Sequence, residues 1–227
     1  MTLSEKLYKI LIKGGSWKTI LGGLWVTVQI SAFALILGTA LGALVCLLRT
    51  RKNPVVRGIA SVYIAILRGT PVLMLLLLLY YGVFARAGLK PITVATVTFA
   101  LNVSAHVAEL LRAALDAADR GQAEAARTLG FSAWSTFRLV TLPQVLRIAK
   151  PVYQSTIVNL IQWTSVVGYV TITDLTRVIN NTASRTMQPL LTISIGMLIY
   201  LALSYIVFGI FALSDKRTAK KRGGVAA

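Results

Sequence analysis

The sequence predicts an all-α integral membrane protein, and three observations support this fold class. Of the 227 residues, 56% are apolar and only 14% are charged, a composition that is too apolar for a single soluble domain. Five stretches are long and apolar enough for transmembrane helices, because about 20 residues of helix cross a hydrocarbon core about 30 Å thick. Basic residues flank these stretches instead of gathering on one face. We therefore expect a five-helix transmembrane domain within residues 19–215.

The predicted spans are bounded by charged residues, Gly or Pro. They run roughly from Leu21 to Leu48, Val55 to Tyr81, Pro91 to Arg112, Val152 to Thr173 and Pro189 to Leu213.

The two ends of the chain are expected to lie outside the spans. Residues 1–18 are predicted to form an amphipathic helix in the membrane interface, with Lys6, Lys9 and Lys13 on its polar face and an end at Gly14-Gly15. A mobile charged tail is the alternative for this segment. Residues 216–227 are predicted to be a basic cytoplasmic tail.

The distribution of Lys and Arg predicts the orientation, because cytoplasmic loops carry the excess of positive charge. Five spans place the two termini on opposite sides. Fifteen Lys and Arg residues lie on the side that holds the loop after the first span, the long loop after the third span and the C-terminal tail, and eight lie on the other side. This predicts an N-terminus outside and a cytoplasmic C-terminus, although the lysines near the N-terminus favour the opposite.

Several function classes are excluded by charge pattern and motifs. The net charge of +17 is spread around apolar spans, so it does not indicate a nucleic-acid partner. The single cysteine, Cys46, lies within the first span and is expected to be a packing residue. The sequence contains no phosphate-binding G-x-x-x-x-G-K-[ST] motif, no set of nucleophile and base, and no cluster of metal ligands. We expect no catalytic residue, metal site or cofactor in this chain.

The loop between the third and fourth spans, at about residues 113–151, is too polar to span a membrane and too regular to be a linker. Its residues predict a helix over Gln122–Leu129, a stop at Gly130, and a second helix capped by Ser132 and ending at Phe137. The small apolar face formed by Leu129, Phe131, Trp134 and Phe137 fits a partner's groove. A cytoplasmic cap that packs against its own helices is the alternative.

The spacing within this loop resembles the EAA motif of the permease subunits of ATP-binding-cassette (ABC) importers. Glu124-Ala125-Ala126 is followed at matching intervals by Gly130, Val140 and Leu142-Pro143, with Val140 in place of a more usual Ile. The chain also resembles the polar amino acid branch of this family, which includes histidine, arginine, glutamine, glutamate and cystine importers. The motifs that carry this resemblance are Arg68-Gly69-Thr70-Pro71, Tyr80-Tyr81-Gly82, Leu101-Asn102, Ala108-Glu109, Gly121-Gln122 and Leu142-Pro143-Gln144.

The resemblance implies a type I importer permease in a bacterial plasma (inner) membrane, with the N-terminus outside. It implies a coupling loop against a cytoplasmic ATPase, formed by Gly121, Glu124, Ala125, Ala126, Gly130, Phe131, Leu142 and Pro143. The implied partners are an ABC ATPase dimer that binds ATP and Mg²⁺, a second permease subunit that is identical or homologous, an extracytoplasmic solute-binding protein and a small polar amino acid. The expected function is inward transport by alternating access.

Polar residues on two spans predict the wall of a substrate path, because polar groups are costly where they face lipid. Thr98, Asn102, His106 and Glu109 share one face of the third span, and Ser155, Asn159 and Gln162 share one face of the fourth, with Thr164 and Ser165 beyond them. Hydrogen bonding between helices is the alternative. His106 stands alone, so lining or packing is favoured over a proton relay or a metal ligand.

A departure from the family pattern leaves the substrate open. Gln162-Trp163-Thr164-Ser165 stands where the branch commonly has Lys-Asp-Thr-Ser, so the family's substrate contacts do not carry over directly.

Arg68 lies deep in the second span, where an arginine needs a partner or a wet cavity. Glu109 is the predicted partner, and Pro71 is expected to kink the same span.

A secondary transporter or channel is the alternative function, since polar-lined helices would serve either. Such a protein would need no docking loop and would usually contain internal repeats, of which we see none.

Overall fold

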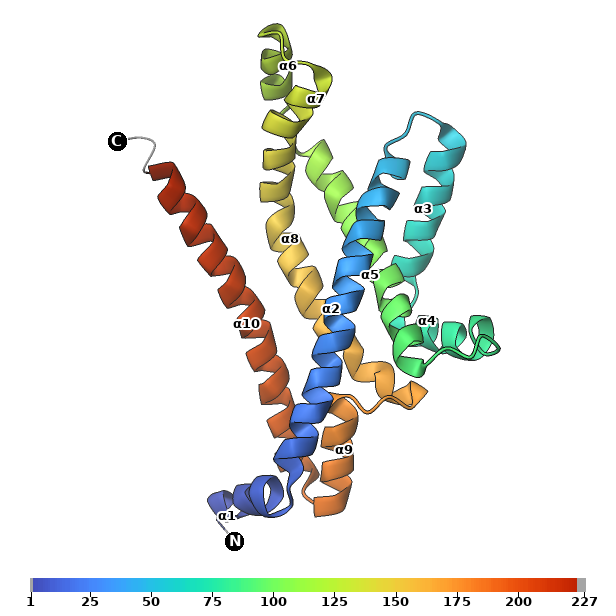
Figure 1. The fold of residues 1–227 in the computed structure, drawn as a ribbon, viewed down its shortest axis with the longest axis vertical. Coiled ribbons are helices and arrows are strands. Elements are labelled where there is room, and N and C mark those ends of the chain that lie inside the picture. Colours follow the sequence, from blue (N-terminus) through green and yellow to red (C-terminus); the bar gives the residue numbers. More distant parts are fainter. Residues whose placement is uncertain (1, 224–227) are drawn as a thin grey trace. The chain divides into compact units, whose positions relative to one another are not determined.

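A computed structural model describes residues 2–223, in which every regular element is a helix (Figure 1). Residues 1 and 224–227 lie outside the described part, and so do the side chains of Leu3, Lys9, Lys13 and residues 216–223. The elements in chain order are α1 (Leu3–Tyr8), η1 (Lys9–Lys13), α2 (Ser16–Arg49), α3 (Pro54–Gly69), α4 (Val72–Leu78), η2 (Leu79–Val83), α5 (Pro91–Asp116), α6 (Arg120–Thr128), α7 (Ala133–Thr136), η3 (Phe137–Thr141), α8 (Leu142–Trp163), η4 (Thr164–Val170), α9 (Leu175–Thr186) and α10 (Pro189–Gly223).

Three helices are long and apolar enough to cross a membrane. They are α2, α5 and the Pro189–Asp215 part of α10, and they contain the first, third and fifth predicted spans. A fourth candidate is the pair α3 with α4 and η2, which qualifies only as a broken span. The described residues thus support a multi-pass membrane protein, and the number of five spans stays a prediction.

The prediction of one continuous helix over Val55 to Tyr81 is wrong. α3 ends at Gly69, Thr70 is extended with φ −100° and ψ 134°, and α4 begins after Pro71. The physical reason is that proline has no N–H for the helix ladder and disfavours helical backbone in the residue before it. Pro71 therefore ends the helix, whereas the sequence analysis expected only a kink.

The predicted fourth span, Val152 to Thr173, has the wrong boundaries. α8 begins at Leu142 and ends at Trp163, and the chain continues as the 3-10 helix η4 up to Val170. Thr171 then adopts a left-handed conformation, with φ 66°. The predicted coupling loop therefore runs directly into α8, and Thr164 and Ser165 lie in a tighter helix with a different periodicity.

The N-terminal segment ends where the sequence predicts. α1 and η1 are followed by Gly14 and by Gly15, whose φ of +63° suits a residue without a Cβ atom. Arg185 of α9 donates from Nη2 to the Gly14 carbonyl at 3.3 Å and to Ser16 Oγ at 2.5 Å. These bonds attach the segment to α9, and its place in a membrane interface stays a prediction. The basic tail is helical up to Gly223.

The chain forms two compact units with separate cores. The first unit comprises residues 1–33, 72–98 and 157–227, and the second comprises residues 34–71 and 99–156. In the first unit, Ile20 of α2 packs with Leu175, Val178 and Ile179 of α9. α10 lies beside α9 (Figure 1).

In the second unit, α2 packs closely against α5 through two glycines four residues apart. A Cβ atom on Gly38 would lie 2.8 Å from the Ala100 carbonyl oxygen, and one on Gly42 would lie 2.7 Å from Val107 Cβ. This is the small-xxx-small arrangement that lets helix backbones approach in membranes. A core of Val45, Cys46, Ala60, Ile64 and Ala108 continues from the contact, which confirms Cys46 as a packing residue.

Candidate functional site

The predicted coupling loop consists of two short helices joined at a glycine, as the sequence analysis expects. Asp119 Oδ1 accepts from the Gly121 backbone N–H at 2.8 Å and begins α6, and Ser132 Oγ accepts from the Ser135 N–H at 3.1 Å and begins α7. Between them Gly130 has φ +87°, a backbone conformation that L side chains rarely adopt. The chain reversal between α6 and α7 therefore depends on this glycine.

Gln144 attaches the beginning of α6 to the beginning of α8. Its side-chain oxygen accepts from the Asp119 backbone N–H at 3.0 Å, and its Nε2 donates to Gln122 Oε1 and to the Val140 carbonyl, both at 3.2 Å. This joins the Gly121-Gln122 motif to the Leu142-Pro143-Gln144 motif, which are distant in the sequence. α6 and α7 lie beyond the N-terminal end of α8 (Figure 1).

The surface of this projection is apolar and exposed. Leu129 is 78% exposed and Trp134 is 67% exposed, and Phe131 and Phe137 are also classed as exposed. The rings of Trp134 and Phe137 stack with centroids 6.0 Å apart. These side chains do not pack into the protein's own core, so the exposure favours a docking surface over a cap on its own helices.

The predicted coupling residues fall into inward-facing and outward-facing sets. Ala126 is buried, whereas Gly121, Glu124, Ala125 and Pro143 are exposed and Leu142 is half-buried. No salt bridge of the described residues involves Glu124. Its carboxylate is therefore free to meet a partner.

On the polar face predicted for the third span, which is α5, Asn102 has a structural role. Asn102 is 3% exposed, and its Nδ2 donates to the Leu67 carbonyl of α3 at 2.9 Å. In a continuous helix that carbonyl would accept from residue 71, but Pro71 has no N–H. Asn102 supplies the missing donor, so the interhelical hydrogen bond explains this residue. Its Oδ1 is buried without a partner among the described atoms.

The described residues contain no salt bridge between Arg68 and Glu109, so this pair stays a prediction. Glu109 Oε1 accepts from Arg112 Nη2 at 2.6 Å, and Arg112 Nη1 contacts Asp116 Oδ2 at 2.5 Å. Residues three and four apart on one helix meet without any tertiary contact. Arg68 is exposed.

The path residues of the fourth span differ in accessibility. Ser155, Asn159 and Gln162 of α8 are exposed, Ser165 is half-buried, and Thr164 is fully buried with its hydroxyl bonded to the Ile161 carbonyl at 2.7 Å. Ser165 lines a cavity of about 350 Å³ together with Gly168, Tyr169, Thr176, Arg177 and Asn180. Arg177 was not a predicted site residue, because no motif in the sequence distinguishes it from the other Lys and Arg residues outside the spans.

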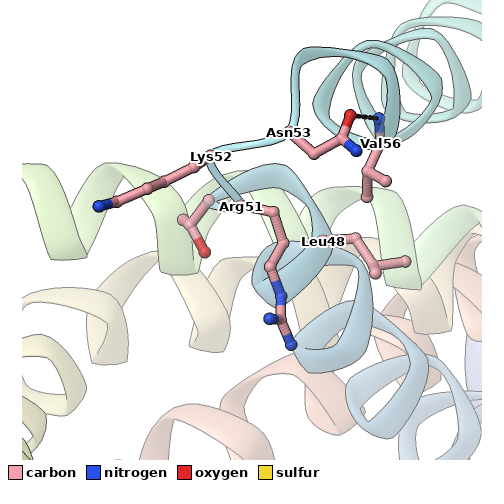
Figure 2. A pocket seen from close by; sticks show the side chains of 6 residues that line it. Leu48, Arg51, Lys52, Asn53 and Val56 are labelled. Carbon is pink, nitrogen blue, oxygen red and sulfur yellow. Dashed lines mark hydrogen bonds between the residues drawn. The ribbon is translucent and has the colours of Figure 1, made fainter.

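A larger cavity lies at the turn between α2 and α3, with a volume of about 700 Å³. Figure 2 shows Arg51 and Lys52 extending from the turn in different directions, while the Asn53 side chain turns back to the Val56 backbone. Asn53 thereby caps α3. None of the predicted site residues lines this cavity, which lies in the positively charged loop after the first span.

No group of three or more His, Cys, Asp or Glu side chains that could hold a metal ion occurs in the described part of the chain.

Long apolar helices with an exposed helical projection define a membrane transport subunit of the permease class. The model of the family described as "Binding-protein-dependent transport system inner membrane component" matches residues 24–220. The chain belongs to this family, whose members are membrane permease subunits and are not themselves catalysts.

Relatives of known name cover most of the chain. It is 34% identical over 173 residues to the probable amino-acid ABC transporter permease protein YckA of Bacillus subtilis, covering 75% of this chain and 76% of that protein. It is 32% identical over 229 residues to the L-cystine transport system permease protein TcyL of the same organism, covering 96% and 92%. It is 30% identical over 222 residues to the histidine/lysine/arginine/ornithine permease HisM of Escherichia coli, covering 88% and 92%.

Solved structures agree in fold. A crystal structure of an amino acid ABC transporter with histidines matches with a TM-score of 0.82 and 28% identity, covering 92% of this chain and 98% of that one. An inward-facing MetNI methionine ABC transporter matches with a TM-score of 0.75 and 19% identity, covering 88% and 95%. Both are ABC transporters, so the alternative of a secondary transporter or channel is not favoured.

Proposed function

We propose that this permease subunit moves a polar amino acid or a related small solute inward by alternating access, with energy supplied by a separate ATPase. The observation that carries the proposal is the exposed apolar surface of α6 and α7, defined by Leu129, Phe131, Trp134 and Phe137. An ATPase cleft would bury this surface, and the unpaired Glu124 at its side would add a charged contact. ATP and Mg²⁺ belong to that partner.

The substrate class rests on the named relatives, which transport cystine in one case and histidine, lysine, arginine and ornithine in another. We propose that His106, Ser155, Asn159, Gln162, Thr164 and Ser165 contribute to the path. We also propose Asn102 for the path, but only through its Oδ1 atom, which has no hydrogen-bond partner among the described residues, because its Nδ2 is bonded to Leu67.

The remaining partners follow from the same class of transporter. We propose a second permease subunit, identical or homologous, that completes the path, and an extracytoplasmic solute-binding protein that delivers the substrate. The proposed location is a bacterial inner membrane with the N-terminus outside, which the excess of Lys and Arg in the α2–α3 turn, the α5–α8 loop and the tail supports.

The proposed coupling between this projection and an ATPase can be tested by adding one methyl group at Gly130. Gly130→Ala adds no clash, since nothing lies within 4 Å of the added Cβ, but it disfavours φ +87°. We expect a loss of at least tenfold in ATPase capture or in substrate-stimulated ATP turnover, because α7 would turn relative to α6. The measurement is a pull-down and an ATPase assay on the permease reconstituted with an ABC ATPase subunit of the same organism.

Gly209→Ala is the matched control, because Gly209 also has open space around its Cβ position and lies in α10. A second pair compares Leu129→Ala with Leu190→Ala, which are 78% and 82% exposed. Equal behaviour within both pairs would contradict the proposal.

A further inference from the structure

The cavity between η4 and α9 is lined by hydrogen-bonding groups. Ser165, Tyr169 and Thr176 contribute hydroxyls, Asn180 an amide, and Arg177 a guanidinium, around a volume of about 350 Å³. This volume falls within the range of small-molecule sites. All of the lining residues belong to the first unit.

Arg177 is held in place from two sides. Its Nη1 donates to the Gly168 carbonyl of η4 at 2.9 Å, and its backbone N–H donates to Asp174 Oδ1 at 3.1 Å. A Cβ atom at Gly168 would lie in ordinary van der Waals contact with Arg177 Cβ, at 3.6 Å, so the two residues are neighbours. One of the five N–H donors of the guanidinium is used by the carbonyl, so the others remain for a ligand.

This half-buried cation has no carboxylate partner among the described residues, whose salt bridges all involve Arg112. The nearest acidic residue in the sequence, Asp174, is committed to the backbone N–H groups of Thr176 and Arg177 at the beginning of α9. An arginine that is held in place and has no carboxylate partner can bind an anionic ligand.

The residues of the first unit proposed for the path on α8 and η4 are Asn159, Gln162, Thr164 and Ser165, and none of them is charged. An amino acid carries a carboxylate that this neutral stripe cannot neutralise. Arg177 is the charged group that shares a cavity with Ser165.

We propose that the η4–α9 cavity binds a carboxylate group, and that this is the α-carboxylate of the transported amino acid. Arg177 is the charged contact, because guanidinium donors match a carboxylate in two parallel hydrogen bonds. Ser165 and Asn180 are neutral hydrogen-bond partners, and the exposed Tyr169 lies at the rim. This inference rests on the proposed function and specifies part of its substrate site.

The test compares amino acids with their amino alcohols, which replace only the carboxylate by a hydroxymethyl group. Full-length permease assembled with its ATPase in nanodiscs is screened with L-histidine, L-arginine, L-glutamine and L-cystine, without any binding protein, by saturation-transfer NMR. The best ligand is then compared with its amino alcohol. We expect wild type to prefer the acid by about tenfold to a hundredfold, the range for a hydrogen bond to a charged group.

Arg177→Gln should abolish this preference and Arg177→Lys should retain part of it. Arg185→Gln is the matched control, because Arg185 lies on the same helix and bonds Gly14 and Ser16 instead. An unchanged acid preference in Arg177→Gln, or no bound amino acid in wild type, overturns the inference.

A loss of binding-protein capture in Arg177→Gln with unchanged amino acid binding would also overturn it, since the carboxylate would then belong to a protein partner. ATPase capture by α6 and α7 is measured in parallel on the same variants. If Arg177→Gln still captures the ATPase, the proposed coupling stands even where the carboxylate site fails.

Discussion

Asn102 illustrates how one side chain compensates for a backbone defect in a membrane helix. Pro71 removes the donor that the Leu67 carbonyl would have in a continuous helix, and the Asn102 amide donates to that carbonyl at 2.9 Å. In an apolar surrounding, an unpaired carbonyl is costly. A residue that looks like path lining in the sequence is therefore a structural donor.

Asn102→Ala should lower the free energy of unfolding by about 1–3 kcal/mol, because it leaves the buried Leu67 carbonyl without a donor. The loss should shrink in the Pro71→Ala background, where residue 71 regains an N–H and helical backbone is allowed at Thr70. Thermal unfolding of the four proteins in detergent gives the coupling energy. Additive losses would contradict this account, and Asn159→Ala, at an exposed position of α8, is the control.

Asp174 lies between η4 and α9, outside the helices that qualify as spans, and is fully buried. Burial raises the pKa of its carboxyl above the usual value, and hydrogen bonds from the Arg177 and Thr176 backbone N–H groups oppose that shift only in part. A folded-state pKa above the unfolded one favours folding when the carboxyl is protonated. That contribution is present below the unfolded pKa and is lost as pH rises through the folded pKa.

Asp174→Asn should therefore flatten the dependence of the unfolding temperature on pH between acid and neutral, because Asn does not ionise. Stability at neutral pH should be kept or increased, since Asn caps helices as well as Asp does. Asp174→Ala should instead lose about 1 kcal/mol with the cap. The measurement is the unfolding temperature as a function of pH. If Asp174→Asn keeps the pH dependence of the wild type, Asp174 is not its cause.

Among the elements, α2 owes its close contact with α5 to Gly38 and Gly42. Both face backbone or branched side chains at less than 3 Å from an added Cβ. Such close approach of two helix backbones gains its strength from van der Waals packing.

Gly42→Ala should destabilise the protein by about 1–3 kcal/mol, the usual cost of forcing an extra carbon into a packed interface. Gly22→Ala on the same helix is the control, because nothing lies within 4 Å of its Cβ position. In a helix interior alanine is favoured over glycine by about 1 kcal/mol, so the control should be neutral or stabilising. Equal unfolding temperatures for the two variants would contradict the packing argument.

For the whole molecule, the charge asymmetry of the loops makes a prediction about orientation that can be checked directly. In a Cys46→Ser background, Thr2→Cys should react with a membrane-impermeant maleimide from the outside, and Ala226→Cys should react only after permeabilisation. Excess Lys and Arg on the cytoplasmic side is the physical reason. Labelling of Ala226→Cys in intact cells would reverse the orientation.

Features with local causes could be predicted from the sequence. Apolar length alone predicted α2, α5 and α10, since a helix in lipid satisfies its own backbone. The caps at Asp119 and Ser132 and the glycine at position 130 act within one turn, so α6, α7 and their junction are close to the prediction. The family followed from short motifs for the same reason.

The tertiary structure decided what depends on residues distant in sequence. It bonded Asn102 to the Leu67 carbonyl and Gln122 to Gln144, formed the salt bridge between Glu109 and Arg112, and brought Arg177 and Ser165 to one cavity. No pattern in a single sequence predicts these contacts, because the partner of each polar side chain depends on which other polar groups the folded helices place near it. The sequence by itself thus determined the class of protein, the long apolar helices and the two short helices of the projection, α6 and α7. Packing decided which polar residues bond to other helices, as Asn102 does, and which stay exposed, as Asn159 does.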